Sequence, residues 1–567
     1  MIRATFAGFN TALSALQSNQ KRLDVTGQNL ANMHTTGYTR QALETSSLNY
    51  HGPVSHYMNG SEIQVGFGVA MDRVTQIRDP FLDAQYRYQM EKSGYTDSLQ
   101  VSLDSMSKFL DETSIGGIRQ AFDNIQSVLL NLQDPSKVNE AVFESELRAR
   151  MEELTNLLNE SARRIEEART QEFQRLDGTG TSQNGAKQTV NDILERIGKL
   201  NRQIKYNQVF NQPSLELMDE RNVLLDELAS YVPIEVSYYK DQGHEGDLDW
   251  PDDLRVNMLY TDENGVQQKL TLVDGTEGAE GQNVGKLEFF HSDGTTPVTY
   301  PLAANQDYLN IQAKFTAAAS ATGQTPVSIT ARDDTSPQNT LSGKGGSIQA
   351  SLDMLGGDKL TAPDKYDTGK IEAANTNVRG YQYYMNQLDN LAHGFGSIID
   401  TINNLEDSSG NKGGDLIVGF ESAATIGINP DWAAGKVYFG KGIDKEGNNP
   451  NDTALAMYGA MSWKYSPNNP YKNIAVDLGG KSFADYMNHV STIQATDSTS
   501  NQNALKTNVT VLNGIQDSRD ALSGISLDEE AANMMTYMAA YNAASRLMTT
   551  LDEALNTLIN GTGLVGR

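Results

Sequence analysis

The sequence predicts a mainly α-helical fold with inserted β-structure, and three observations support this. Apolar residues recur every three or four positions at both ends of the chain and through residues 118–231, which is the period of a helix with one apolar face. From residue 234 apolar and polar residues alternate instead, as in strands. The helical period then returns near residue 372. We therefore expect terminal coiled-coil helices, a helical-bundle core domain, and one or two inserted β-rich outer domains.

The N-terminal segment has a helical stripe without a charged outer face. The stripe alternates steps of four and three residues, the spacing of a coiled-coil seam. Its apolar members are Ile2, Phe6, Phe9, Leu13, Leu16, Leu23 and Leu30. Residues 4–20 contain no charged side chain. A solvated helix carries Lys and Glu on its outer face, whereas this one carries Ser, Thr, Asn and Gln.

The C-terminal segment repeats this design. Ser526 and Glu529 have the spacing of a helix-capping box, and a second stripe of three- and four-residue steps follows them. Its members are Met534, Tyr537, Tyr541, Ala544, Met548, Leu551, Leu555 and Leu558. Between residues 531 and 551 only Arg546 is charged.

The two ends are complementary in charge. Residues 1–40 hold four basic side chains and one acidic side chain, a net of +3, and residues 526–567 hold two basic and five acidic ones, a net of −3. Two readings remain open: the ends are surface helices of a globular core, or they are an assembly interface. The charge-poor outer faces favour the interface, made by the two stripes.

The middle of the chain is helical first and β-rich afterwards. Apolar stripes predict four helices, at 118–132, 143–168, 190–204 and 217–231, and Pro233 stops the last one. Alternating runs then predict strands within 234–331, with a hairpin turn at 261–265. Helix resumes at 372–404 and at 481–522, separated by a Gly-, Asn- and Pro-rich segment.

These patterns divide the chain into four parts. They are a terminal helical domain from 1–60 and 526–567; a helical core domain from 61–233, 372–405 and 476–525; an inserted β-rich outer domain at 234–371; and an irregular or β insertion at 406–475.

Composition excludes several classes of protein. The formal net charge of −27 disfavours nucleic-acid binding, which needs a basic surface. The chain has no cysteine, and therefore no disulfide, thiol nucleophile or thiolate metal site. No apolar run reaches the roughly 18 residues of a membrane span, and the N-terminus lacks the apolar core of a cleaved signal. We expect a soluble protein with no membrane insertion, either cytosolic or exported without a cleaved signal.

The sequence contains no recognisable chemical site. The seven histidines are scattered, and there is no HExxH, GxSxG or Walker A motif. The oxygen-rich stretch 444–452 could hold Ca²⁺, but it lacks the pattern of an EF-hand, so we expect a solvated turn. We predict no catalytic, cofactor-binding or metal-binding residue, no cofactor, and a protein that is not an enzyme.

The stretch NLANMHTTGYTR at 29–40 needs its own explanation. Asn29, Asn32, His34 and Tyr38 could form a catalytic corner, but no carboxylate is near them in sequence. The alternative is a joint between two elements. Gly37 can adopt a left-handed conformation that stops a helix, and the Thr and Tyr residues around it favour an extended exit. We favour the joint.

The same stretch carries a resemblance to a known family. Residues 14–41 resemble the N-terminal signature of the flagellar axial proteins, the rod, hook and hook–filament junction subunits. The core of the signature is Asn29, Ala31, Asn32, Thr36, Gly37 and Tyr38. Residues 200–204, 217–232 and 524–559 are similar to stretches typical of the junction subunits. The resemblance covers 1–235, a helical piece near 372–404, and 478–567.

The resemblance implies a structural subunit of the bacterial flagellum that joins hook to filament. It implies that both termini pair in the inner tube of a hollow helical ring while the middle segments fold outward. It also implies export without a signal and an extracellular position at the hook–filament junction. The implied partners are further copies of the chain, the hook protein, a second junction protein, and an export chaperone on the C-terminal helix.

Two other functions stay open at this point. An axial protein could display a catalytic or adhesive domain within 234–370, although that segment contains no HExxH motif. Alternatively, the chain could be a cytosolic coiled-coil scaffold unrelated to flagella. The inserted segments 234–370 and 406–475 resemble nothing that identifies their role.

Overall fold

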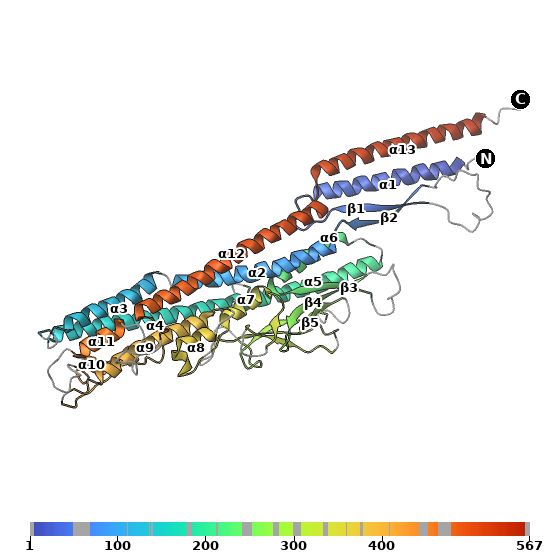
Figure 1. The fold of residues 1–567 in the computed structure, drawn as a ribbon. Coiled ribbons are helices and arrows are strands. Elements are labelled where there is room, and N and C mark those ends of the chain that lie inside the picture. Colours follow the sequence, from blue (N-terminus) through green and yellow to red (C-terminus); the bar gives the residue numbers. More distant parts are fainter. Residues whose placement is uncertain are drawn as a thin grey trace, which may run out of the picture.

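The structure is a computed structural model of the 567-residue chain. It describes residues 5–48, 68–109, 112–134, 136–137, 140–178, 184–210, 212, 214–240, 252–275, 283–298, 308–321, 323–332, 338–358, 360–374, 378–407, 409–440, 452–462 and 478–561. Figure 1 shows an elongated molecule with both termini at one end. The predicted class, mainly α-helical with inserted β-structure, is confirmed.

The end of the molecule that holds the termini contains two helices and a hairpin. Helix α1 (Thr5–Ala31) lies beside α13 (Leu527–Gly561). Strands β1 (Gln41–Ser47) and β2 (Val69–Gln76) form an antiparallel pair that packs on α1. Because β2 is paired with β1, this unit reaches Gln76, beyond the boundary at residue 60 that the sequence suggested. We call α1, α13 and the hairpin the terminal unit.

A bundle of long helices forms the body of the molecule. Its first helices are α2 (Pro80–Phe109), α3 (Glu112–Leu132), α4 (Ala141–Asp177), α5 (Ala186–Val209) and α6 (Leu215–Tyr231). The four helices predicted within 118–231 are confirmed as α3 to α6, and each is longer than its apolar stripe. The stripes face one shared core, in which the fully buried aromatic side chains include Phe122, Phe173, Tyr381, Phe395 and Tyr486.

The β-rich insertion contains two small antiparallel sheets. The first is built from β3 (Ile234–Tyr239), β4 (Asp253–Thr261), β5 (Gln267–Asp274) and β9 (Thr340–Leu341). The second is built from β6 (Leu287–Phe290), β7 (Gln312–Phe315) and β8 (Val327–Ile329). The predicted hairpin turn lies between β4 and β5, where the Asp262 carboxylate accepts the backbone N–H groups of Asn264 and Val266.

Helical structure returns earlier than the sequence suggested. Helix α7 (Gly346–Leu355) lies in the stretch assigned to the β-rich domain, but it is largely buried and packs against α2. A 3₁₀ turn η2 (Asp364–Tyr366), α8 (Thr368–Ala373) and α9 (Tyr381–Asn403) follow it. Most residues of α7 are buried, so this helix has no exposed polar face. Without such a face the sequence shows no helical period, and the spacing of its residues did not predict the helix.

In its described residues, the segment expected to be irregular contains elements of two to eleven residues. They are β10 (Ile417–Val418), β11 (Gly427–Ile428), α10 (Pro430–Ala433) and α11 (Asp452–Ser462). The candidate Ca²⁺ stretch, 444–452, lies outside the described residues except for Asp452.

One long helix connects the body to the terminal unit. Helix α12 (Phe483–Ser523) begins among the body helices, runs along α2, and ends at the corner where α13 starts (Figure 1). The Ser482 hydroxyl caps its first turn by accepting the backbone N–H of Asp485 at 3.2 Å.

Candidate assembly surface and joint

Helices α1 and α13 make close contact along one face. A Cβ atom on Gly8 would lie 3.4 Å from Leu551 Cδ1, so the Leu551 side chain rests on the α1 backbone. Further along, the Arg22 guanidinium lies 5.4 Å from the centre of the Tyr537 ring and donates to Thr45 Oγ1 at 2.9 Å. One arginine therefore joins α1, α13 and strand β1.

The predicted α13 stripe faces α1 but is only partly covered. Ala544 is buried, whereas Leu558 at the far end is 56% exposed. The other members have intermediate exposure: Met534, Tyr537, Tyr541, Met548, Leu551 and Leu555. Pairing with α1 therefore leaves apolar area on α13 open to solvent in the single chain.

The predicted α1 stripe is not the most buried face of its helix. Leu13 is 44% exposed, and Phe9, Leu16, Leu23 and Leu30 have intermediate exposure; of Phe6 the structure describes only the backbone. The buried residues of α1 are Ala12, Ser18, Val25, Thr26 and Asn29. Helix α1 packs on the hairpin as well as on α13, and the polar side chains of Ser14, Arg22 and Asn29 bind the hairpin.

Asn29 links the end of α1 to the hairpin. Its side chain donates to the Gln41 carbonyl at 3.0 Å and accepts the Gln41 N–H at 3.0 Å, as a neighbouring strand would. Its Oδ1 also accepts the Tyr38 hydroxyl at 3.1 Å. Of the signature residues, the fold thus brings Asn29 and Tyr38 together. Asn32 shapes the turn after α1, while Ala31 and Thr36 are exposed.

Gly37 adopts the left-handed conformation that the sequence predicted, with a φ of 78°. Its position is not the end of a helix, however, because α1 ends at Ala31. The loop crosses α6 at this point, and a Cβ on Gly37 would lie 2.3 Å from Val223 Cγ2. Close approach to α6 therefore adds a second requirement for glycine that the sequence could not reveal.

A buried carboxylate on α6 holds the residues after Gly37. Asp219 accepts the backbone N–H of Thr39 at 3.1 Å and the Thr39 hydroxyl at 2.6 Å. Burial raises the pKa of Asp219, and the Thr39 hydrogen bonds and the nearby Arg78 charge oppose that shift. Burial, with the charges of Glu216, Asp219 and Glu530, also raises the pKa of Tyr38 to about 12.

Arg78 extends this contact into the body. It lies between β2 and α2, with its Nη1 3.6 Å from Asp219 Oδ1, and it holds Asp83 through two bonds of 2.9 and 3.1 Å. Burial alone would raise the pKa of Asp83, but the hydrogen bond and charge of Arg78, with Arg519 and Arg87, lower it. Asp83 is therefore a carboxylate held in its charged form by its neighbours.

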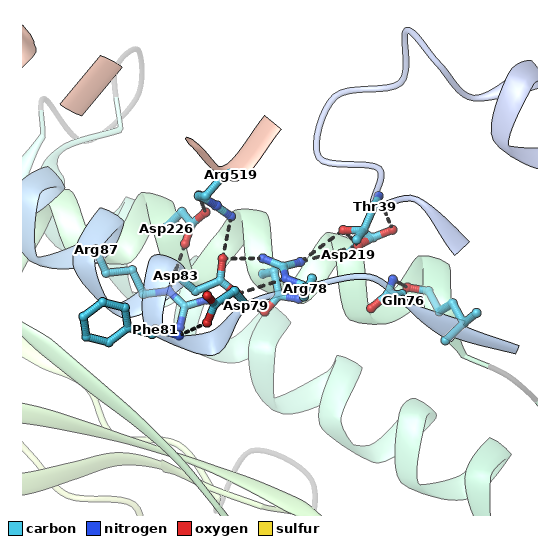
Figure 2. Close-up of polar contacts among 12 residues, drawn as sticks. Thr39, Gln76, Arg78, Asp79, Phe81, Asp83, Arg87, Asp219, Asp226 and Arg519 are labelled. Carbon is cyan, nitrogen blue, oxygen red and sulfur yellow. Dashed lines mark hydrogen bonds and ion pairs between the residues drawn. The ribbon is translucent and has the colours of Figure 1, made fainter. Parts of the chain in front are cut away.

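Arg519 on α12 completes the network. It lies 3.0 Å from Asp83 and 2.9 Å from Asp226, and Arg87 also binds Asp226 at 2.9 Å. Figure 2 shows these side chains forming a continuous chain of ion pairs from Arg519 to Asp219, which is hydrogen-bonded to Thr39. We call this network the joint; its charged members are Arg78, Asp83, Arg87, Asp219, Asp226 and Arg519.

A second set of contacts ties the corner between α12 and α13 to the hairpin. Arg40 binds Glu530 at 2.8 Å and Glu529 at 3.0 Å. The backbone N–H of Arg40 donates to the Ser523 carbonyl at 2.9 Å, and its own carbonyl accepts the N–H of Ile77 at 2.9 Å. The expected capping box is only partly formed, since Ser526 accepts the N–H of Glu529 at 3.5 Å while the Glu529 side chain binds Arg40.

The sequence predicted a joint at 29–40 but not the ion-pair network that holds it, because the members of the network are far apart in the chain. The motif residues Gly37 and Tyr38 marked the loop on one side of the network. The carboxylates on α2 and α6 could not be recognised, because the chain has 72 Asp and Glu residues and nothing in the sequence distinguishes these from the others. The catalytic alternative required a carboxylate near the motif. The fold does bring Asp219 there, but hydrogen bonds to Thr39 occupy it.

The described residues offer no metal site. Within the described ranges, no group of three or more His, Asp or Glu side chains is placed to hold a metal ion. Among the helices that the structure describes, none combines the length and apolarity needed to cross a membrane. What stands out is a partly covered helical pair fixed to a long body through a polar joint.

This arrangement matches the flagellar axial proteins at both ends of the chain. The family described as "Flagella basal body rod protein" matches residues 9–39, and "Flagellar basal body rod FlgEFG protein C-terminal" matches 518–561. These ranges contain α1 with its following loop, and Arg519 with α13. "Flagellar hook-associated protein FlgK helical domain" matches residues 103–417, more than half of the chain. The chain belongs to the FlgK family of flagellar hook-associated proteins, as its motifs indicated.

Relatives matched by sequence agree with this assignment. Flagellar hook-associated protein 1 of Bacillus subtilis is 29% identical over 575 residues, covering 100% of both chains. The proteins of that name from Salmonella typhimurium and Escherichia coli are 25% identical over 233 residues, 40% of this chain and 38% and 39% of theirs. The structure of the flagellar hook junction protein FlgK from Burkholderia pseudomallei aligns with a TM-score of 0.37 and 16% identity, over 59% of this chain and 46% of that one.

Proposed function

We propose that the chain is a structural subunit that joins the flagellar hook to the filament, and that α1 and α13 are the surfaces through which its copies assemble. The observation that carries this proposal is the incomplete burial of the α1–α13 pair. Leu13, Leu547 and Leu558 are 44%, 49% and 56% exposed, on helices with few charges. Apolar area left open on a helical pair is typical of a surface that another chain covers.

The joint supports the same proposal. A subunit in a ring must hold its inner helices at one angle to its outer body, because an error in one copy is repeated in all. Asp219, Asp83 and Arg519 fix that angle through charged hydrogen bonds, which are stronger and more directional than apolar contacts.

The proposal includes the partners and the location. The neighbours are copies of the same chain in a hollow helical ring, the hook protein on one side, and a second junction protein on the other. An export chaperone binds the C-terminal helix before assembly, and the protein is secreted to the hook–filament junction without a cleaved signal. Support for these points is the family membership and the cysteine-free, acidic composition.

Neither alternative function has a supporting observation. The matched relatives are named as flagellar hook-associated proteins, which gives no support to a cytosolic scaffold. Nothing in the described part of the β-rich insertion suggests a catalytic or adhesive site, so the proposal is a subunit that is not an enzyme.

Immuno-gold labelling of flagellated cells tests the proposal. We expect a short band of label at the boundary between hook and filament, and loss of filaments from hooks when the gene is deleted. Label along the whole filament, or label confined to the cytoplasm, would overturn it. A hydrolase assay on the full chain tests the alternative in which the chain displays an enzyme, because hydrolase activity would support that alternative.

A further inference from the structure

Helix α12 is anchored in the apolar core only at its first residues. Its buried apolar side chains are Phe483, Tyr486, Met487 and Val490. The Phe483 ring stacks on Phe122 with centroids 5.2 Å apart, and the Tyr486 hydroxyl accepts a hydrogen bond from Asn390 at 3.2 Å. These residues form the foot of α12, and they fix the position of the helix along its axis.

Above Val490 the buried residues of α12 are amides. Only Gln494 and Asn501 are buried in the remaining 33 residues. Gln494 donates to the Leu103 carbonyl at 3.0 Å, and Asn501 donates to the Thr96 carbonyl at 2.8 Å. Seven residues further on, Asn508 accepts two hydrogen bonds from Gln89, of 3.0 and 3.2 Å.

These contacts form a ladder between antiparallel helices. Positions 494, 501 and 508 repeat every seven residues, the spacing at which one face of a helix meets its partner in a coiled coil. An amide at such a position fixes the register but contributes less stability than an apolar side chain. The part of α12 between residues 491 and 523 is therefore aligned on α2 mainly through polar contacts.

The packing beside this ladder is open. A groove of about 680 Å³ runs along the contact between α2 and α12, and its lining includes Leu99, Leu103, Ala504 and Thr507. In this region of α12, Leu505, Leu512 and Ile515 are only partly buried. Little apolar area would be lost if this part of α12 moved away from α2.

The strongest contact of this segment is at its upper end. Arg519 binds Asp83 and Asp226 and lies 4.4 Å from the centre of the Tyr86 ring. Four residues beyond, the Ser523 carbonyl accepts the N–H of Arg40, which ties the segment to the hairpin and not to the body. Arg519 is thus the charged contact that closes the segment onto α2 and α6.

We propose that residues 491–523 form a strap that opens as one unit about Val490, with Arg519 as its clasp. Segments with few buried apolar contacts open at lower free energy than the core of the same protein. A strap held by a foot, an amide ladder, an ion pair between Asp497 and Arg379 at 2.8 Å and the Arg519 contacts has this character. When the clasp is released, this part of α12 can separate from α2 while the body helices stay packed and Thr39 stays bound to Asp219.

Hydrogen exchange measured by mass spectrometry on the full-length protein tests the strap. We expect Arg519→Ala to speed exchange about tenfold or more in peptides from 491–523, because hydrogen bonds to charged groups are the strongest in the segment. Exchange in the foot and in α4 should not change. Lys506→Ala, on the exposed side of the same helix, is the matched control and should leave the strap slow.

A cysteine pair makes the test reversible. The chain has no cysteine, so Gln89→Cys with Asn508→Cys can be oxidised to close the ladder without competing thiols. In the Arg519→Ala background, oxidation should return the strap to slow exchange and reduction should release it. Two results would overturn the proposal: strap exchange in Arg519→Ala equal to that in Lys506→Ala, or foot and strap accelerating together as one cooperative unit.

Discussion

Gly37 and Val223 are in contact across the junction between the terminal unit and the body. Gly37 has a φ of 78°, and a Cβ built on it would lie 2.3 Å from Val223 Cγ2. Two independent reasons therefore exclude a side chain here: the left-handed backbone and the α6 surface beneath it. Directly after this contact, Thr39 is bound by Asp219, so a shift of the loop would disturb the joint.

Gly37→Val should displace the loop and loosen the joint by ~1–2 kcal/mol or more, because a β-branched side chain is strained at positive φ. Hydrogen exchange in residues 32–48 should rise, while the melting temperature of the body should not change. In cells we expect a secreted protein that attaches filaments poorly, measured as reduced motility and filaments shed into the medium. Wild-type motility in Gly37→Val would show that the loop is not a joint.

Gly37→Ala separates the two reasons for glycine. Its Cβ meets Val223, so the change costs more than the left-handed strain alone. Combining it with Val223→Ala removes the collision and leaves the strain, so the double variant should recover part of the lost protection in residues 32–48. Full recovery would mean that backbone strain contributes nothing, and no recovery would mean that Val223 is not the obstacle.

Leu551→Asp should separate α13 from α1 without unfolding the body. Leu551 rests on Gly8, and a carboxylate at a partly buried contact costs ~1–3 kcal/mol. We expect faster proteolysis of α13, an unchanged melting temperature of the body, and no filament attachment. Thr550→Asp, which places the same charge on the exposed side of α13, should leave the contact between the two helices intact.

Limited proteolysis of the free protein should remove the ends first. The stripes on α1 and α13 are only partly buried in the single chain, so the terminal unit opens more readily than the body. Protease should trim roughly the first 40 and the last 40 residues and leave a stable helical fragment. Ends as resistant as α4 would contradict the argument that assembly completes the folding of these helices.

Asp400 on α9 should make the stability of the body depend on pH. Its Oδ1 accepts the N–H groups of Leu416 and Ile417 at 2.7 and 3.0 Å, and its Oδ2 has no partner among the described residues. Burial raises the pKa of Asp400 to about 7, against the effect of those two bonds. The folded state therefore holds this proton more tightly than the unfolded state, and the stabilisation is complete below the unfolded value of 3.8 and lost as pH rises through 7.

The Asp400→Asn variant tests the direction of this pH dependence of stability. The amide can accept the same two backbone hydrogen bonds and carries no charge, so the variant should match wild type below the unfolded pKa of 3.8 and exceed its melting temperature at pH 8 by about 2–4 °C. A difference that is constant between pH 5 and pH 8 would show that Asp400 does not titrate in this range.

The sequence by itself determined the local structure and the family. Regular apolar spacing predicted α3 to α6, because a helix that buries one face must repeat its apolar residues at the helical period. Gly37 was predicted to be left-handed because glycine tolerates that conformation. The terminal stripes indicated paired helices, and the motif around Asn29 indicated the flagellar class.

Tertiary structure alone decided which of these residues meet. The stripe through Leu13 and Leu16 is only partly buried, because α1 also packs against a hairpin, to which Asn29 is hydrogen-bonded. The helical period of α1 could not predict this hairpin contact. Val223 lies beneath Gly37, and Asp83, Asp226 and Arg519 come together from three helices. Helical periodicity is a property of neighbouring residues, and it therefore survives in the sequence. An ion-pair network is formed by residues that folding brings together from distant positions, so the spacing of residues along the chain does not predict it.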